Sequence, residues 1–339
     1  MTAAKDARAP FERVAAELRS RITSGQLAAG ERLPSGRELA EQHGIALATA
    51  QSALKRLRDE GLATSIFLAL ALPRPLLLEG EAGVGKTEVA LALARWTGGE
   101  LLRLQCYEGI DASQAVYEWD YSRQLLHLRA AEASGLAVVE DELYSERFLV
   151  KRPLLRAIGY EADALGATAP PVLLVDEVDR ADDEFEAFLL EILSDYTVTV
   201  PELGTFHAST PPLVIVTSNR TRDVHDALKR RCLYHWIEHP DFERELAILR
   251  LRAPEVPERL ARQVAAAVEE LRRLDLYKPP GVAETLDWAN ALAALGQTDV
   301  NEASVSVTLG TILKYREDQE RTRAHGLDVL VRGATERPG

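Results

Sequence analysis

Glycines, a lysine and a threonine stand at spacings that suit the binding of phosphate groups. An apolar run from Pro75 to Glu79 leads into them, and an alanine- and leucine-rich helix is predicted to follow. Backbone N–H groups that converge at the N-terminus of a helix bind phosphate oxygens, because the helix dipole is positive there. The residues of this phosphate loop are Gly80, Glu81, Ala82, Gly83, Val84, Gly85, Lys86 and Thr87.

Each residue type in the phosphate loop has a chemical use. Gly80, Gly83 and Gly85 let the backbone come close to the phosphates. Lys86 can reach the β- and γ-phosphates as a point charge, and the Thr87 hydroxyl can ligate Mg²⁺. The alternative is an ordinary glycine turn, but these fixed positions would arise by chance in roughly one chain in a hundred of this length. We therefore predict a nucleotide-binding loop.

Two carboxylates follow a second apolar run, Val172 to Val175. This run predicts a buried strand that brings Asp176 and Glu177 to its carboxyl end, beside the phosphate loop. Asp176 is suited to hold hydrated Mg²⁺, and Glu177 is suited to polarise the attacking water. The alternative is a strand that simply ends in solvated acids.

A polar amide and a basic cluster complete the candidate site. Asn219 ends the apolar strand predicted from Pro212, and it can hydrogen-bond the attacking water or the γ-phosphate, although it can also be a plain turn residue. Arg230 and Arg231 precede the last predicted strand, Tyr234 to His239. They form either a solvated helix end or, as we favour, a source of an arginine supplied to a neighbouring subunit's γ-phosphate.

The remaining pattern predicts how these residues are positioned. A further strand is predicted from Leu101 to Cys106, and the alternation around Gly204 between Thr197 and His207 predicts an inserted hairpin. The C-terminal part is helical in pattern, and its predicted segments are 242–252, 257–274, 283–294 and 301–323. We predict a doubly wound parallel α/β sheet with a helical lid over the nucleotide.

Charge and composition limit the possible partners. The 339 residues carry a net charge of −13; residues 1–65 hold ten Lys/Arg against eight Asp/Glu, a net +2, so the remainder carries −15. An acidic body disfavours the wrapping of nucleic acid, so DNA contact is reasonable only at the N-terminus. No segment is apolar and long enough to span a bilayer, and Cys106 and Cys232 suit a reducing compartment, so we expect a cytoplasmic protein.

Four potential metal ligands fall close together in the sequence. They are His225, Cys232, His235 and His239. No second Cys pair at zinc-finger spacing accompanies them, and His235 lies in a predicted strand. A zinc site is therefore not expected.

The N-terminal residues predict a small helical domain. Apolar residues at helical spacing run from Phe11 to Ile22, Ser35 can cap a helix that ends at Gln42, and a second helix is predicted from Leu47 to Glu60. This arrangement is typical of a helix-turn-helix. Ser24–Ala40, Ala48–Leu54 and Glu60–Leu62 resemble the DNA-binding domain of GntR-type regulators.

The GntR resemblance implies specific DNA contacts. Thr49 and Gln51 would enter the major groove, and Arg37 would lie near the DNA backbone. Leu47 stands where that family commonly has an arginine, and the β-hairpin wing that should follow Leu62 is missing. Residues 1–62 are therefore either a weak DNA-binding domain or a domain that has kept its fold and lost its affinity for DNA.

Four motifs occur in the order found in AAA+ ATPases. They are the phosphate loop, the strand that ends at Asp176, Asn219 and Arg231. The predicted hairpin before Asn219 resembles the MoxR branch of that family. Gln105–Tyr121, Leu228–Asp241 and Lys278–Trp288 resemble the CoxD accessory ATPases of carbon monoxide dehydrogenase maturation.

These resemblances imply roles for individual residues and for the domains. Asn219 would be the sensor 1 residue, and Arg231, or alternatively Arg230, would be the arginine finger. No arginine stands at the usual sensor 2 position, where Gly281 to Asp287 occurs. An AAA+ core at 63–240 and a lid at 241–339 are implied.

The resemblance also implies ATP and Mg²⁺ as cofactors and a hexameric ring. A von Willebrand factor A domain protein is the implied partner, and a molybdenum hydroxylase of the carbon monoxide dehydrogenase type is the implied client. The main alternative is a GntR-like transcription regulator that carries an ATPase ring. A small-molecule P-loop kinase is disfavoured, because a monomeric kinase needs neither Asn219 nor Arg231 in these roles.

Overall fold

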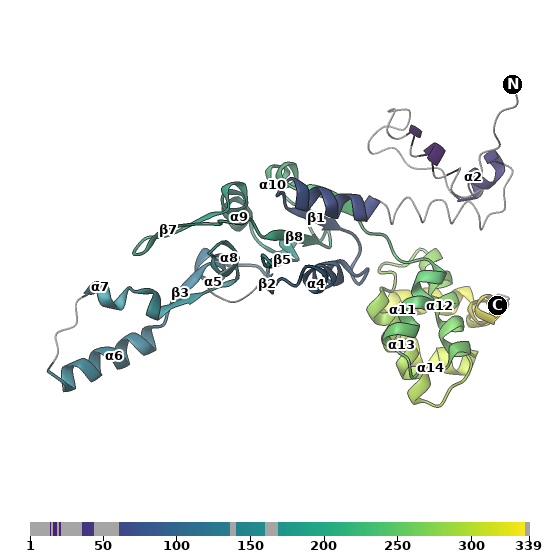
Figure 1. Cartoon of the computed structure of the whole chain (residues 1–339). Coiled ribbons are helices and arrows are strands. Elements are labelled where there is room, and N and C mark those ends of the chain that lie inside the picture. Colours follow the sequence, from purple (N-terminus) through teal and green to yellow (C-terminus); the bar gives the residue numbers. More distant parts are fainter. Residues whose placement is uncertain are drawn as a thin grey trace, which may run out of the picture. The chain divides into compact units, whose positions relative to one another are not determined.

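The computed structural model describes residues 14, 16–18, 20–21, 36–43, 61–135, 140–159 and 169–335. The chain divides into two compact units, Met1–Leu76 and Leu77–Gly339 (Figure 1). In the first unit, α2 (Gly36–His43) buries Leu39 and exposes Arg37. Residues 61–71, where a GntR wing would begin, form a helix. The predicted helix from Leu47 to Glu60 lies outside the described residues.

A five-stranded sheet forms the centre of the second unit, with the strand order β2-β5-β8-β1-β9. The strands are β1 (Leu76–Glu79), β2 (Leu101–Gln105), β5 (Val172–Asp176), β8 (Leu213–Ser218) and β9 (Leu233–Trp236). β5 pairs in parallel with β2 and with β8, and Gln105 lies opposite Asp176 in the register. The predicted doubly wound parallel sheet is confirmed, and its carboxyl edge brings together the ends of strands that are far apart in sequence.

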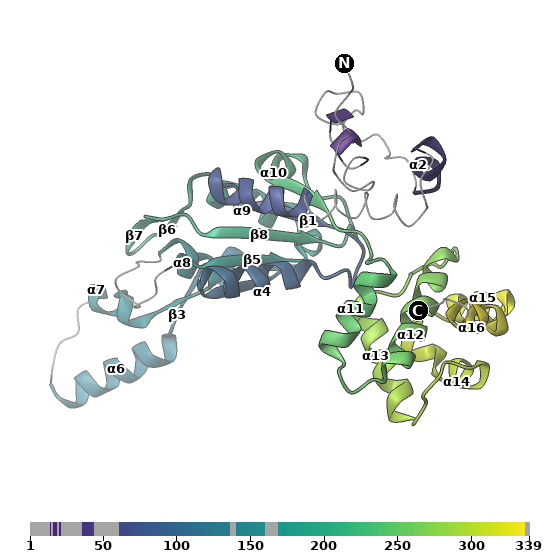
Figure 2. The ribbon, with the colours of Figure 1, turned by 45° about the vertical axis from the view of Figure 1, so that its right-hand side comes forward.

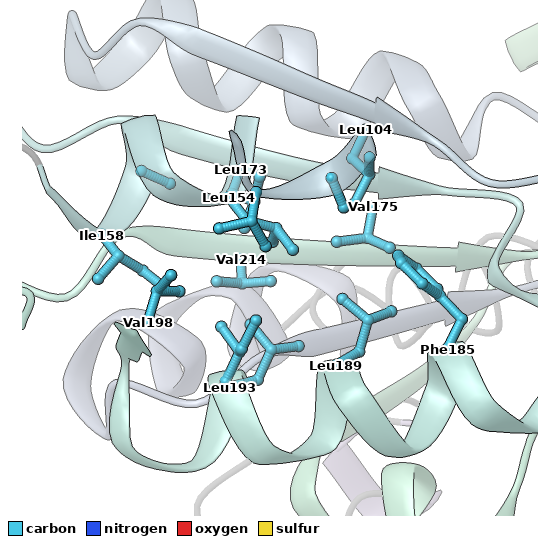
Figure 3. Close-up of a cluster of buried hydrophobic side chains, with 14 of the residues drawn as sticks. Leu104, Leu154, Ile158, Leu173, Val175, Phe185, Leu189, Leu193, Val198 and Val214 are labelled. Atoms are coloured by element: carbon cyan, nitrogen blue, oxygen red, sulfur yellow. The ribbon is translucent and has the colours of Figure 1, made fainter. Parts of the chain in front are cut away.

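Both faces of the sheet are covered by helices, which explains why the central strands are apolar throughout. α4 (Lys86–Thr97) packs against β2, β5 and β8. On the opposite face, α9 (Asp183–Asp195) and α8 (Pro153–Ile158) bury side chains such as Leu173 and Leu189 (Figures 2 and 3). Each fully buried leucine contributes about 1.5–3 kcal/mol, so this core holds the carboxyl ends of the strands in register.

An insertion that the sequence pattern did not predict separates β2 from β5. Its elements are α5 (Ala112–Ala115), β3 (Tyr117–Trp119), α6 (Tyr121–Ala133), α7 (Glu140–Leu143), η1 (Glu146–Phe148) and β4 (Leu149–Lys151). β3 and β4 pair antiparallel, and Trp119 packs edge to face on Tyr144. The predicted hairpin is present further along, as β6 (Thr197–Val200) and β7 (Gly204–His207).

The C-terminal residues form a helical bundle with its own buried core, as expected. Its helices are α11 (Phe242–Arg252), α12 (Glu258–Arg273), α13 (Val282–Ala294), α14 (Glu302–Ile312), α15 (Arg316–His325) and α16 (Leu327–Thr335). The single helix predicted over 301–323 is wrong, because the chain is extended at Leu313 and Tyr315, between α14 and α15. Among the described helices, none combines the length and the apolar character needed to cross a bilayer.

Candidate nucleotide-binding site

The phosphate loop lies between β1 and α4, as its sequence predicts. Gly83 and Gly85 have φ values of 78° and 96°, a backbone conformation that glycine adopts without strain. A Cβ on Gly80 would lie 2.3 Å from the Ile237 carbonyl oxygen, so this position is closed to any larger residue. Space is open around Gly85, because a Cβ added at this position would have no neighbouring heavy atom within 4 Å. Within the same loop, Glu81 is exposed, Ala82 is half-buried and Val84 is buried.

Lys86 begins α4 and folds back over the loop. Its side-chain Nζ donates to the carbonyl oxygens of Gly80 at 2.8 Å and Glu81 at 2.7 Å. Burial lowers the pKa of Lys86, although the nearby carboxylates of Asp179, Glu81, Asp176 and Glu177 oppose that shift. The positive end of the helix and a buried ammonium therefore meet at one place, which suits an anionic ligand.

Asp176 connects the phosphate loop to the central strands. Its carboxylate lies 3.3 Å from the Thr87 hydroxyl and accepts a hydrogen bond of 2.6 Å from the Thr217 hydroxyl. The Arg103 guanidinium donates to it at 2.5 Å. The predicted pair of magnesium ligands, Thr87 and Asp176, is thus side by side in the structure.

Glu177 has a left-handed backbone, with φ 56° and ψ 51°. Its carboxylate accepts hydrogen bonds from Asn219 Nδ2 at 3.1 Å, Gln105 Nε2 at 3.0 Å and Arg180 Nη1 at 3.2 Å. A non-glycine residue in this conformation costs of order 1–3 kcal/mol, and such strain is concentrated at functional sites. The fold therefore stabilises Glu177 in an unfavourable conformation that aims its carboxylate at Asn219.

Asn219 is itself positioned by a buried acid. The Asp179 carboxylate accepts the backbone N–H of Asn219 at 3.1 Å and that of Thr221 at 2.8 Å. Asp179 is only 2% exposed, so these bonds are shielded from water and hold the loop after β8 firmly. Asn219 and Glu177, predicted separately, are brought together in the structure.

Among the residues of the site that were not predicted are Arg103, Gln105 and Asp179. A signal for the first two was present, because Arg103 and Gln105 are two residues apart on β2 and project from the same face at its carboxyl end. Arg103 donates to the Gln105 side-chain oxygen at 2.7 Å, so the pair joins Asp176 to Glu177. Asp179 had no such signal, because its contacts depend on the approach of the Asn219 loop.

Arg230 and Arg231 end α10 (Asp226–Arg231), and both are exposed. Exposure at a helix end is compatible with either a solvated cluster or an arginine directed at a neighbouring subunit. Of the three DNA-contact candidates, Arg37 is exposed on α2, whereas Thr49 and Gln51 lie outside the described residues.

Cys106 follows β2 directly beside this site, where its backbone N–H donates to the Asp176 carbonyl oxygen at 2.9 Å. Burial, together with the nearby carboxylates, raises the pKa of the Cys106 thiol to about 12. The thiol is therefore protonated at neutral pH and is not a nucleophile.

Two domain families match the chain. Residues 75–232 match the model of the AAA domain, dynein-related subfamily, and residues 10–66 match that of the bacterial regulatory proteins of the gntR family. Comparison with curated proteins finds no match.

Similar solved structures include a candidate ATPase from Cytophaga hutchinsonii ATCC 33406, with 14% identity, 96% of each chain covered and a TM-score of 0.42. A point mutant of Thermotoga maritima RuvB is 13% identical in sequence, and its TM-score is 0.43. The match covers 77% of this chain and 71% of the RuvB chain. The Thermotoga maritima RuvB Holliday junction branch migration motor is 14% identical in sequence, and its TM-score is 0.40. The match covers 75% of this chain and 66% of the motor chain. From the two family models, the chain combines a gntR-type helix-turn-helix domain with an AAA-type ATPase domain.

Proposed function

We propose that the chain binds ATP in the phosphate loop and hydrolyses it, with Glu177 as the residue that activates water. The observation that carries this proposal is the position of the Glu177 carboxylate. It is held by Asn219 and Gln105 and follows directly after Asp176, which contacts Thr87 of the phosphate loop. A carboxylate fixed in this way, beside a phosphate-binding loop, is suited to accept a proton from water.

The residues present fit a nucleotide and a magnesium ion. The left-handed glycines and the buried Lys86 ammonium suit a polyphosphate, and the Thr87 hydroxyl and Asp176 carboxylate are the oxygen ligands that Mg²⁺ prefers. When bound, Mg²⁺ neutralises negative charge on the β- and γ-phosphate oxygens. Arg103, which pairs with Asp176, would have to share that carboxylate with the ion.

Each side chain of the site has a separate task in this proposal. Lys86 stabilises negative charge on the phosphates, and Glu177 orients water and takes its proton. Asn219 fixes the Glu177 carboxylate, and Asp179 fixes Asn219. Arg231 of a neighbouring subunit would add positive charge where the γ-phosphate leaves, so the full site needs two subunits.

Replacing Lys86 tests the binding step. We expect Lys86→Ala to weaken ATP binding by at least about 100-fold, because a buried charge-assisted contact worth roughly 3 kcal/mol is lost. Lys314→Ala is the matched control, since Lys314 is an exposed lysine in the break between α14 and α15, and its Nζ donates only to the Thr311 carbonyl oxygen among the described residues. Isothermal titration calorimetry with ATP measures both variants. Equal affinities would show that the phosphate loop is not the binding site.

The wider proposal is a ring-forming ATPase of the MoxR type that remodels a client protein. It rests on the sequence resemblance and is supported by the β6–β7 hairpin, which lies directly before β8. The resemblance to CoxD-type ATPases suggests a molybdenum hydroxylase of the carbon monoxide dehydrogenase type as client. It also suggests a von Willebrand factor A domain protein as partner.

A substrate trap can identify the client. A Glu177→Gln chain, purified from its own cells in the presence of ATP, should enrich the client, because a ring that cannot hydrolyse ATP stays engaged. Lys86→Ala is the control, since a chain that does not bind ATP should not stay engaged with the client. Mass spectrometry that finds a molybdenum hydroxylase on the first chain and not on the second supports the proposal, and enrichment of unrelated proteins alone contradicts it.

The rival function is transcription regulation, which the match of residues 10–66 favours. Charge opposes it, because residues 1–65 carry only +2 while the rest of the chain carries −15. Phosphate contacts supply most of the affinity of DNA-binding domains, and few cations are available for them here. We therefore expect residues 1–65 to bind DNA no better than non-specifically, and a footprint on a defined operator would favour the rival.

A further inference from the structure

His239 lies on the segment that joins β9 to α11, and this segment runs along the start of the phosphate loop. Two residues before it, the Ile237 backbone N–H donates to the Glu79 carbonyl oxygen at 2.7 Å. The Ile237 carbonyl oxygen is also the atom that any Cβ on Gly80 would strike. The joining segment is therefore held against the loop by backbone contacts, and His239 follows directly.

The lid fixes the other side of this segment through Arg272. The guanidinium pairs with both oxygens of Glu245, at 2.6 and 3.1 Å. It also donates to the carbonyl oxygens of Pro240, at 3.3 Å, and Pro280, at 2.8 Å. Because Pro240 follows His239, the backbone of His239 is held from both sides.

The imidazole of His239 has unused hydrogen-bonding capacity. Both ring nitrogens are buried and have no hydrogen-bond partner among the described residues. Buried polar groups in folded proteins nearly always have a hydrogen-bond partner. Two ring nitrogens without a partner, beside the phosphate loop, therefore call for an explanation. Nothing in the site described above uses them.

The charge state of the ring narrows the choice of ligand. Burial, and then the positive charges of Arg272 and Lys86, lower the pKa of His239 to about 4. At neutral pH the ring therefore carries one N–H donor and one acceptor nitrogen and no charge. A phosphate group offers only acceptors and favours cations, whereas a nucleobase offers both donors and acceptors.

We infer that His239 hydrogen-bonds the base of the nucleotide bound at the phosphate loop, and so contributes to the choice of adenine. This inference rests on the proposed function, because it assumes that the loop binds ATP. It assigns His239 a role in binding and specificity only; Glu177 and Lys86 keep the roles given above. Ribose hydroxyls also combine donor and acceptor, so the experiment must separate them from the base.

The test compares His239→Leu with His239→Gln in the full chain. Leucine fills a similar space without hydrogen-bonding groups, and glutamine retains a donor and an acceptor. Calorimetry measures the affinity for ATP, 2′-deoxy-ATP and inorganic tripolyphosphate. We expect His239→Leu to weaken ATP and 2′-deoxy-ATP by about 10-fold or more, as for a hydrogen bond lost in a buried site, and to leave tripolyphosphate unchanged. His239→Gln should recover most of the affinity.

Each other outcome overturns the inference. Equal loss for tripolyphosphate means that the variant damages the loop or that His239 contacts phosphate. Loss for ATP but not for 2′-deoxy-ATP assigns His239 to the ribose, and unchanged ATP affinity means that the ring has no nucleotide partner. The Lys86→Ala chain separates the two proposals: if wild type binds ATP in a Lys86-dependent way while His239→Leu is unaffected, only the inference fails. If wild type binds no ATP, both fail.

Discussion

Glu177→Gln should bind ATP as tightly as the wild type and hydrolyse it at least about 100-fold more slowly. General-base catalysis contributes about 10²–10⁴-fold to enzyme rates, and an amide cannot take the proton that a carboxylate takes. Glutamine has the same length and can still accept the Asn219 hydrogen bond, so the geometry of the site should survive. Phosphate release and ATP binding, measured on the same preparation, check both halves of this expectation.

Glu184→Gln is the matched control for that experiment. Glu184 is an exposed acid in the first turn of α9, on the same stretch of chain, and the change removes the same charge without touching the site. It should hydrolyse ATP like the wild type. Full turnover by Glu177→Gln would remove Glu177 from its assigned role and leave water activation to another residue.

Arg231→Ala should lower hydrolysis by about 10³-fold or more while ATP still binds, since an arginine finger is worth 10³–10⁵ in the rate of other phosphoryl-transfer enzymes. Because the guanidinium would act on a neighbouring subunit, mixing Arg231→Ala with Lys86→Ala chains should restore part of the activity. In such a mixture, some interfaces combine an intact loop with an intact Arg231. Steady-state hydrolysis across mixing ratios measures this recovery.

Arg230→Ala distinguishes the two arginines at the end of α10. If Arg231 is the arginine finger, Arg230→Ala should keep most of the ATPase activity. If Arg230→Ala instead loses the activity and Arg231→Ala keeps it, Arg230 is the arginine finger. No recovery at any ratio, in samples shown by sedimentation to form rings, would contradict action in trans for both residues.

Local sequence was sufficient for the phosphate loop and for the strands that carry Asp176 and Asn219, because glycine spacing and apolar runs are properties of short segments. It was insufficient where tertiary contacts decide. The break between α14 and α15 has no proline or glycine; Leu313 is instead buried, and its carbonyl oxygen accepts from the Gln319 side chain at 2.9 Å. A helical pattern alone could not reveal this break.

The sequence predicted the reactive residues of the candidate site, but it did not predict the residues that position them. Lys86, Glu177 and Asn219 each stand in a recognisable motif, whereas Gln105 reaches Glu177 only through the register that sets Gln105 opposite Asp176. In the sequence, His239 is one of four potential zinc ligands, and no zinc site is expected there. The absence of a hydrogen-bond partner for either ring nitrogen, among the described residues, depends on tertiary packing that the sequence pattern does not reveal.

Two glycines meet where the phosphate loop touches the lid. Gly281 approaches to 3.0 Å from the Cβ position of Gly83, and the Val282 backbone N–H donates to the Gly83 carbonyl oxygen at 3.0 Å. Backbone touches backbone here, so no flexible side chain can absorb a displacement between them. A displacement of the lid is therefore transmitted directly to the phosphate loop, and if the chain works on a client as proposed, mechanical load on the lid should change the rate of nucleotide release.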